Sequence, residues 1–127
     1  MPTDIALTGL AMPIGEFPAI AREAEERGYR TAWVGEASGT EAIVLSTLIA
    51  THTSKIRIAN GVIPVQTRTP IVYGQAAATL AHLSNGRFAL GLGLSLGLSA
   101  AVAADALSAG YTEIGDPVTP DGSVAAQ

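Results

Sequence analysis

Glu36 is the residue of this chain best placed to do chemistry. It directly follows the apolar run of residues 32–35, whose composition is typical of a buried strand. A carboxylate at the carboxyl end of a parallel strand lies where α/β proteins hold functional groups. The alternative is a helix N-terminal acid, because a helix is expected from about Ser38 and its dipole favours a negative charge. We favour the functional interpretation over the helix-terminal one.

A second candidate is the backbone corner Gly61-Val62-Ile63-Pro64, which we call the corner. Glycine inside a strand pattern often marks a bulge or the close approach of a ligand, and proline ends regular pairing on one side. The carboxyl edge of a sheet, where such an irregular backbone is expected here, is also where α/β proteins bind ligands. The simpler alternative is a strand end followed by a stop signal.

A third candidate is the glycine cluster of Gly91, Gly93 and Gly97. A dinucleotide fingerprint needs its third glycine three residues after the second, but that position holds Leu96 and Gly97 comes one step late. We therefore favour a tight turn with close packing of a helix on the strand over a small dinucleotide-binding domain. Glycines at this point would also let a flat cofactor approach the backbone.

Other catalytic chemistries lack the residues that they need. There is no cysteine and no His-Glu-x-x-His set, so we expect no metal. His52 and His82 fall near expected helix ends, where a cation is favourable and catalysis is not indicated. Ser38, Ser46 and Ser84 have no nucleophile-elbow context, so a hydrolase triad is not supported.

Strands and helices alternate along the predicted order of elements. Ser38 to Glu41 has the spacing of a capping box, Thr69-Pro70 is typical of a helix start, and Ser84-Asn85-Gly86 of a helix end. Strict alternation predicts a parallel sheet with right-handed crossovers, which a doubly wound sandwich, a shortened barrel or half a barrel would all satisfy. The expected strands are 5–10, 31–35, 56–63 and 88–92, the last buried on both faces; the expected helices are 16–28, 38–51, 69–83 and 99–108.

Composition narrows the class of protein. The 127 residues suit one domain, and a hydrophobic content of 48% with mean hydropathy +0.36 excludes disorder for most of the chain. The net charge of −4 and the absence of a basic patch argue against nucleic acid. Residues 88–104 are uncharged, but glycines and serines interrupt them, so we expect no membrane segment. The N-terminus lacks signal-peptide features, which favours a cytoplasmic protein.

Long stretches around these candidates are similar to the bacterial-luciferase-like superfamily of monooxygenases and oxidoreductases. The similarity covers residues 4 to 93, about the first third of a typical family member. It is carried by residues 25–36 (Glu-Glu-Arg-Gly-Tyr-Arg-Thr-Ala-Trp-Val-Gly-Glu), 38–42, 54–65 (Ser-Lys-Ile-Arg-Ile-Ala-Asn-Gly-Val-Ile-Pro-Val), 68–70 (Arg-Thr-Pro), 75–80 (Gln-Ala-Ala-Ala-Thr-Leu) and 83–93 (Leu-Ser-Asn-Gly-Arg-Phe-Ala-Leu-Gly-Leu-Gly).

The resemblance implies a (β/α)8 barrel that uses a flavin or a deazaflavin for hydride transfer or monooxygenation. The segments around Glu36 and Arg68 look closest to the deazaflavin-dependent branch that includes methylenetetrahydromethanopterin reductase. This branch implies coenzyme F420, with FMN as the alternative. It also implies a cis non-prolyl bond between Gly61 and Val62 behind the coenzyme ring, with Glu36 near the ring and the Thr67-Arg68 turn beside it, Thr67 being a coenzyme-binding residue. Gly91 and Gly93 would leave space for the ring at the next strand.

The chain departs from the family after Gly93, where typical members continue through four further strand–helix units. Those units supply most of the phosphate-binding residues, whereas this sequence becomes Ala-rich and stops at Gln127. We expect residues 1–109 to form a truncated (half) TIM barrel of four βα units and residues 110–127 a loop-rich tail. The leading hypothesis is a truncated oxidoreductase whose ancestral chemistry is hydride transfer, although the missing half argues against catalysis by the chain alone. The alternative is a non-catalytic half-barrel that self-associates through its open sheet edges or complements a partner chain.

Overall fold

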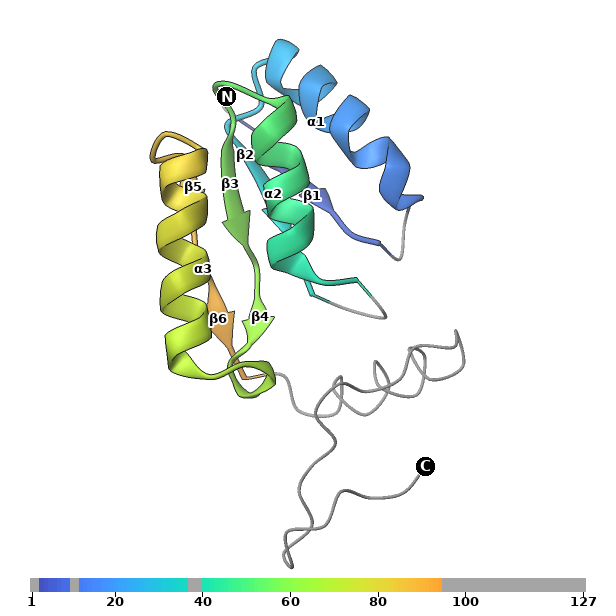
Figure 1. Cartoon of the computed structure of the whole chain (residues 1–127). Helices are drawn as coiled ribbons and strands as arrows, with labels where there is room; N and C mark the ends of the chain where they lie inside the picture. The colour runs from blue at the N-terminus through green and yellow to red at the C-terminus, as the bar shows by residue number, and fades with distance from the viewer. Residues whose placement is uncertain (1–2, 10–11, 37–39, 95–127) are drawn as a thin grey trace, which may run out of the picture.

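A central parallel sheet with helices on one face is the main feature of the computed structural model (Figure 1). The structure describes residues 3–9, 12–36 and 40–94. Four strands pair in the order β1-β2-β3-β5, and a second pair, β4-β6, continues beyond the corner. The elements are β1 (Ile5–Leu7), η1 (Ile14–Glu16), α1 (Phe17–Glu26), β2 (Thr31–Val34), α2 (Ala42–His52), β3 (Arg57–Asn60), β4 (Ile63–Pro64), η2 (Val65–Thr67), α3 (Pro70–Leu83), β5 (Phe88–Ala89) and β6 (Leu92–Gly93).

The predicted parallel sheet is confirmed. Each strand of the main sheet pairs in parallel with the next one, so that Ala32 aligns with Ile5 on one side and with Ile58 on the other. Because consecutive strands are neighbours and each is joined to the next by a helix on the same face, the sheet is wound as the wall of a βα barrel. The expected strands 56–63 and 88–92 are each interrupted, and their second halves form the β4–β6 pair.

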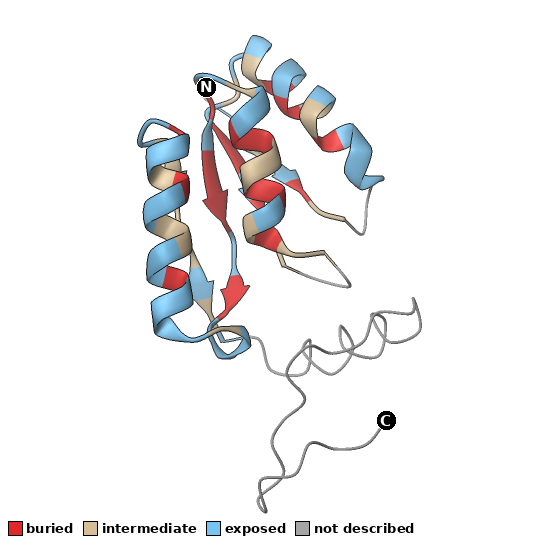
Figure 2. Ribbon diagram, in the orientation of Figure 1, coloured by how far each residue is buried: buried red, intermediate tan, exposed pale blue. Residues whose placement is uncertain are grey.

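The hydrophobic core lies between the sheet and the three helices (Figure 2). Leu7, Val34 and Ile58 point from the strands into this layer, and Phe17 and Ile49 meet them from α1 and α2; all five are 0% exposed. The apolar spacing of α1 therefore predicted its buried face correctly. Gly28 ends α1 as expected, with φ +81°, and the Tyr29 N–H donates to the Ala24 carbonyl in a Schellman arrangement.

The second face of the sheet carries no helix within the described residues. Trp33 stands on this open face, because its neighbours Ala32 and Val34 are fully buried and alternate residues of a strand point to opposite sides. Phe88 and Ala89 of β5 are half-buried. The expectation that this strand is buried on both faces was wrong: among the described residues, β5 stands at the edge of the sheet and no helix covers its second face.

The starts of two helices differ from the prediction. Glu41 is itself the N-cap of α2, and its carboxylate accepts a hydrogen bond of 2.6 Å from the Val44 N–H. Ser38, the expected cap, lies outside the described residues. Thr69 is the N-cap of α3, as predicted, but its side chain makes no capping hydrogen bond. The end of α3 has positive φ at Asn85 and Gly86, as its sequence predicts.

Several expectations fall outside the part of the chain that the structure describes. They are the helix over residues 99–108, the role of Gly97 and the tail over residues 110–127. Among the residues that are described, none of the helices combines the length and the apolar character needed to cross a membrane.

The carboxylate of Glu25 joins the end of α1 to the start of β3. It accepts backbone hydrogen bonds from Ser54 at 3.0 Å and from Ile56 at 2.7 Å, and a further one from Lys55. Partial burial acts to raise the pKa of Glu25, but these hydrogen bonds outweigh it and hold the pKa below its ordinary value. A carboxylate with a lowered pKa stabilises the fold above its unfolded-state pKa, and this stabilisation is lost as the pH falls through the lowered value.

We expect Glu25→Gln to lower the free energy of unfolding by about 1–2 kcal/mol at neutral pH, because a neutral amide replaces the charged acceptor. Urea unfolding followed by circular dichroism measures the loss. It should shrink on acidification below the lowered pKa, where the wild-type carboxylate is itself protonated. Glu26→Gln, on the exposed side of the same helix, should leave stability nearly unchanged. An equal loss at neutral and acidic pH would contradict this account of Glu25.

Candidate functional site

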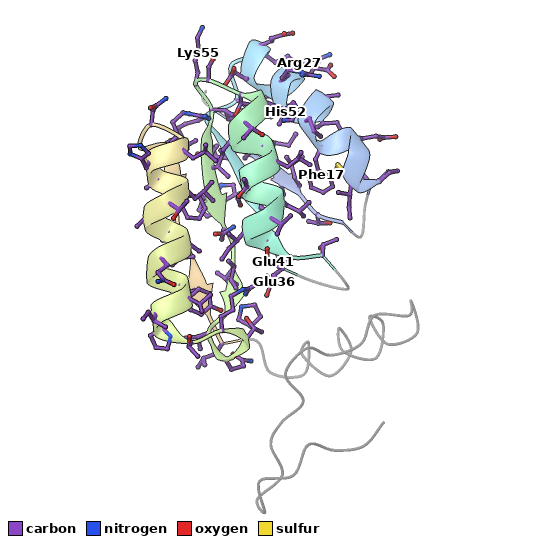
Figure 3. The ribbon with its side chains drawn as sticks, viewed as in Figure 1. Phe17, Arg27, Glu36, Glu41, His52 and Lys55 are labelled. Atoms are coloured by element: carbon purple, nitrogen blue, oxygen red, sulfur yellow. The ribbon has the colours of Figure 1, made fainter. Side chains whose placement is uncertain are left out.

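The carboxyl ends of the strands bring polar residues from three segments together. Glu36 lies two residues beyond β2, Glu41 caps α2, and Arg68 follows the turn after β4. Figure 3 shows Glu36 and Glu41 at one end of α2, with His52 and Lys55 at the other. The site therefore forms at the edge where the sequence predicted it.

Arg68 joins both carboxylates in an arrangement that we call the ion network (Glu36, Glu41 and Arg68). Its Nη1 donates to Glu36 Oε1 at 3.0 Å, and its Nη2 donates to Glu36 Oε2 at 2.6 Å, which makes the pair bidentate. Nη2 also contacts Glu41 Oε1. The side chains of Arg68 and Glu36 are only 16% and 10% exposed, so water screens this pair far less than an ordinary surface ion pair.

The charge state of Arg68 is fixed by these contacts. Partial burial acts to lower its pKa, but the hydrogen bonds with Glu36 and Tyr73 and the charges of Glu36 and Glu41 outweigh burial and raise the pKa. Arg68 is therefore a permanent cation. Both Glu36 oxygens are engaged, since Oε2 also accepts from the Ala42 N–H at 3.1 Å at the start of α2. This geometry suits Glu36 to positioning rather than to proton transfer.

Two hydroxyl groups connect the ion network to the corner. The Tyr73 hydroxyl donates to the Pro64 carbonyl at 2.6 Å and lies 3.0 Å from Thr67 Oγ1. Thr67 Oγ1 in turn accepts from Arg68 Nη1 at 2.9 Å and donates to the Pro64 carbonyl at 2.8 Å. The Arg68 guanidinium also lies 5.7 Å from the centre of the Tyr73 ring, within cation–π range. These contacts of Thr67 and Arg68 with Tyr73 connect the turn after β4 to the beginning of α3.

The corner itself lies between β2 and β6. The peptide bond between Gly61 and Val62 is cis, as the family resemblance implied. The Gly61 N–H donates to the Val34 carbonyl at 3.0 Å, and the Glu36 N–H donates to the Val62 carbonyl at 3.4 Å. Val62 is 44% exposed, and its side chain lies next to Gly93 of β6.

Three glycines allow this close packing. A Cβ atom at Gly61 would lie 2.8 Å from the Trp33 ring, so only glycine lets the ring lie against the corner. A Cβ atom at Gly91 would lie 1.8 Å from the Asn60 carbonyl oxygen, and one at Gly93 would lie 2.7 Å from a Val62 methyl. Gly91 and Gly93 therefore allow close packing against β3 and the corner, whereas the helix that was expected to pack here lies outside the described residues. A coenzyme role for Gly91 and Gly93 stays a prediction.

The open face offers one apolar wall and little positive charge. Trp33, 41% exposed, lies against Gly61, and Val62, 44% exposed, follows Gly61 in the chain; we call these two side chains the wall. Trp33 Nε1 donates to Asp4 at 3.1 Å, which holds the ring. Of the seven Lys and Arg residues, Arg68 alone lies at this edge, and two carboxylates already neutralise it. An anionic coenzyme tail therefore has no cationic partner among the described residues.

The structure brings the predicted site residues together. Glu36 and Thr67 are in contact at 3.5 Å, Gly61 and Val62 lie beside them, and Gly91 accepts a hydrogen bond from Ile63 within the corner. Four other residues of this region were not among the predicted site residues, namely Trp33, Glu41, Arg68 and Tyr73. Arg68 had a usable signal, because it is the sole Asp, Glu, Lys or Arg between Arg57 and Arg87 and a lone charge among apolar residues needs a partner.

A parallel sheet wound in this order, with polar residues gathered at its carboxyl edge, is part of a βα barrel. The family model of luciferase-like monooxygenases matches residues 1–106, and the chain belongs to this family. A Mycobacterium tuberculosis protein named as a coenzyme F420-dependent oxidoreductase is 36% identical over 85 residues, covering 67% of this chain and 24% of that protein. The 4-hydroxyprotoasukamycin monooxygenase of Streptomyces nodosus is 33% identical over 95 residues, covering 64% of this chain and 26% of that enzyme.

Solved structures agree on the fold. The coenzyme F420-dependent tetrahydromethanopterin reductase of Methanopyrus kandleri superposes with a TM-score of 0.68 at 25% identity, covering 87% of this chain and 30% of that one. The oxygenating constituent of 3,6-diketocamphane monooxygenase from Pseudomonas putida, in complex with FMN, gives a TM-score of 0.71 at 18% identity, covering 89% and 35%. The chain spans about a quarter of the length of the curated relatives it matches.

We expect Arg68→Met to lower the free energy of unfolding by about 2–3 kcal/mol, because it leaves two carboxylates facing each other, one of them nearly buried. Arg27→Met is the matched control, since Arg27 and Glu23 form an exposed i,i+4 pair worth at most about 0.5 kcal/mol. Urea unfolding at neutral pH measures both. Adding Glu36→Gln to Arg68→Met should restore part of the loss. Equal effects of Arg68→Met and Arg27→Met would show that the ion network is not a stabilising centre.

Proposed function

We propose that this chain supplies the ring-binding wall of a coenzyme site in a luciferase-like oxidoreductase. The coenzyme would be F420, with FMN as the alternative, and the chemistry would be hydride transfer. The observation that carries the proposal is the exposure of two apolar side chains, Trp33 and Val62, that both adjoin Gly61. Glu36 of the ion network holds the Val62 carbonyl through its own N–H. The similarity to the Mycobacterium tuberculosis and Methanopyrus kandleri proteins, both named as F420-dependent, favours F420, whereas the Pseudomonas putida structure holds FMN.

Each residue has a definite part in this proposal. Val62 and Trp33 would pack against one face of the ring and exclude water from it. Glu36 holds the Val62 carbonyl through its own N–H, and Thr67 and Arg68 hold the far side of the corner. A bound flavin or deazaflavin supplies the ring atom that accepts or releases the hydride. We assign no catalytic residue within this chain, because the carboxylate nearest the corner is fully engaged.

The proposal separates ring binding from tail binding. The described residues offer a wall for the ring but no free cation for a phosphate at this edge. We therefore propose that the described residues bind the coenzyme through its ring. The residues that bind the phosphate would then lie outside residues 3–94. A coenzyme and its phosphate-free ring should then bind about equally well.

A second candidate function rests on the edges of the sheet. β1 and β5 each have one neighbour in the order β1-β2-β3-β5, which leaves one side of each strand unpaired among the described residues. A non-catalytic role would use these edges to pair with a partner chain that completes the sheet. Hydrogen exchange tests this role, because pairing would slow amide exchange in β1 and β5.

Trp33 allows a direct test of ring binding, because it is the single tryptophan of the chain and lies on the proposed wall. Titration with F420, FMN and riboflavin should quench its fluorescence in a saturable way, with FMN and riboflavin about equal. Val62→Asp should weaken binding at least about tenfold, because it would bury a charge against the ring.

Val44→Asp is the matched control, since Val44 is 66% exposed on α2, which covers the opposite face of the sheet. It should leave the titration unchanged. If no ligand gives saturable quenching up to high micromolar concentration, the coenzyme proposal fails. Much tighter binding of FMN than of riboflavin would contradict the assignment of affinity to the ring.

A further inference from the structure

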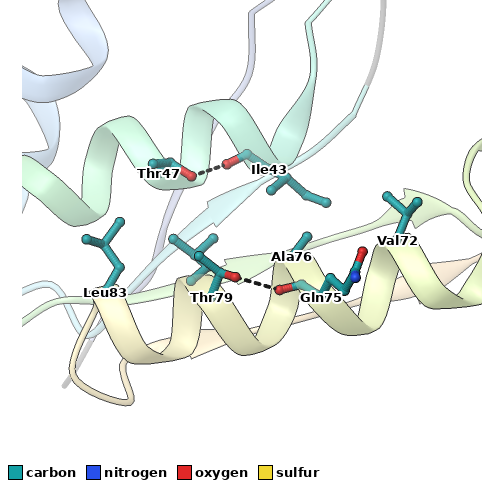
Figure 4. Close-up of a pocket in the computed structure, with 8 residues that line it drawn as sticks. Ile43, Thr47, Val72, Gln75, Ala76, Thr79 and Leu83 are labelled. Carbon is teal, nitrogen blue, oxygen red and sulfur yellow. Dashed lines mark hydrogen bonds between the residues drawn. The ribbon is translucent and has the colours of Figure 1, made fainter.

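Ser46 differs from the other hydroxyl side chains of α2 in the partner that it bonds to. Thr47 Oγ1 donates to the Ile43 carbonyl at 2.8 Å, one turn back in the same helix, and Thr51 Oγ1 donates to the Thr47 carbonyl at 3.1 Å. Figure 4 shows the Thr47 bond together with the equivalent bond of Thr79 in α3. Such bonds stay within one helix and position nothing outside it. Ser46 instead accepts a hydrogen bond from the sheet.

The donor is Asn60, the last residue of β3. Its Nδ2 donates to Ser46 Oγ at 3.0 Å. Ser46 is fully buried and Asn60 is 1% exposed. The other buried strand residues that face the helices from the main sheet are apolar, namely Leu7, Ala32, Val34 and Ile58. Asn60 and Ser46, which we call the buried pair, therefore form a polar contact inside an apolar layer.

The buried pair gives the fold little net stability. An amide side chain carries a carbonyl acceptor as well as its N–H donors. Asn60 Oδ1 is the single buried side-chain N or O atom of the described residues that has no hydrogen-bond partner, and an unpaired buried acceptor offsets what the bond to Ser46 contributes. Replacing both partners of such a bond by apolar groups of similar shape is nearly neutral or stabilising. Stability alone therefore gives no reason for a polar pair at this point.

A hydrogen bond adds a fixed direction and distance to apolar packing. The end of β3 is already held within the plane of the sheet, since Asn60 aligns with Val34 and the Gly61 N–H donates to the Val34 carbonyl at 3.0 Å. On the other side, the Asn60 carbonyl oxygen lies so close to Gly91 that a Cβ atom there would approach it to 1.8 Å. The bond to Ser46 acts in the third direction, across the layer between the sheet and α2.

This third direction is the one to which the corner is sensitive. Gly61 follows Asn60 directly, and the Trp33 ring lies so close to Gly61 that a Cβ atom there would lie 2.8 Å from it. A movement of Asn60 toward or away from α2 would therefore change the contact of Gly61 with the ring. It would also carry Val62, the next residue of the corner.

Helix α2 gives the buried pair a fixed reference. Ala42 and Ser46 are both fully buried and lie one turn apart on the same side of the helix. The Ala42 N–H donates to Glu36 Oε2 at 3.1 Å, and Glu36 holds the Val62 carbonyl through its own N–H. The corner is thus connected to α2 twice, through Glu36 at its outer end and through Asn60 inside the core.

We propose that Asn60 and Ser46 are positioning residues of the candidate site, whose buried hydrogen bond sets the distance of the corner from α2 and does not serve stability. The consequence for ligand binding rests on the proposed function, because Val62 and Trp33 are the wall that would contact the coenzyme ring. The position of the corner can be observed without any ligand, since Trp33 lies against Gly61.

Stability measurements on variants of the full chain test the first part of the proposal. Ser46→Ala leaves the Asn60 amide buried without an acceptor, so the midpoint of urea unfolding should fall by about 1 M. Adding Asn60→Leu replaces the whole pair at nearly constant volume and should return the midpoint to within about 0.3 M of the wild-type value. Ser84→Ala is the matched control, because Ser84 is a fully buried serine at the far end of α3 whose hydroxyl donates to the Ala81 carbonyl.

The double variant Asn60→Leu/Ser46→Ala should lose the position of the corner although it keeps its stability. In a two-dimensional NMR spectrum of the free protein, the Nε1–H signal of Trp33 should shift or broaden, because Gly61 is no longer held at one distance from the ring. The Trp33 titration with riboflavin should show an affinity about tenfold weaker. Ser84→Ala should match the wild type in both measurements.

A double variant with an unchanged indole signal and unchanged riboflavin affinity would overturn the proposal. So would a double variant much less stable than the wild type, because the buried pair would then serve folding. An altered indole signal with unaltered affinity would overturn the part that concerns ligand binding. If the wild type itself binds no riboflavin, an altered indole signal still supports the role of the buried pair, and the proposed function alone fails.

Discussion

The pairing of Arg68 with two carboxylates is the interaction on which the arrangement of the site depends. Glu36, Glu41 and Arg68 come from the end of β2, the start of α2 and the turn after β4. A nearly buried carboxylate is costly unless it is paired and hydrogen-bonded, so the end of β2 and the turn after β4 must meet for Glu36 and Arg68 to be satisfied. The position of the corner is thus coupled to the start of α2.

Glu36 combines the two roles that the sequence offered for it, at a helix N-terminus and at a candidate ligand site. Its carboxylate accepts from the Ala42 N–H at the beginning of α2, which is the helix-terminal role, while its own N–H donates to the Val62 carbonyl of the corner. One residue therefore joins helix, ion network and corner. Its contribution to a ligand site would be made through the backbone that it holds rather than through a free carboxylate.

The sequence alone predicted the helix boundaries correctly where a single residue type, glycine or proline, strongly restricts the backbone. Gly28, Pro70 and Gly86 placed helix boundaries to within a residue or two, because positive φ and the missing proline N–H leave few alternatives. The apolar residues Phe17, Ala21 and Ala24 predicted the buried side of α1 in the same way.

Features that depend on distant partners could not be predicted in this manner. The strand over residues 56–63 is broken at the corner by contacts with Val34 and Gly91, which come from other strands. The half-buried state of β5 follows from its place at the edge, which its own apolar sequence does not reveal. Glu41 was expected as the distal residue of a capping box and became the cap itself, where it also contacts Arg68. In each case the observed structure depends on contacts with residues that are distant in the sequence.

The open face of the sheet is the surface that separates the proposed function from the stability of the fold. A parallel sheet is normally covered on both faces, but here helices cover one face only within the described residues. The open face presents an indole ring that Asp4 holds, and Val62 of the corner is an exposed aliphatic side chain. The hydrophobic core lies on the other face, between the sheet and the three helices. A substitution at Val62 therefore leaves the core in place, so that its effect on ligand binding can be distinguished from an effect on folding.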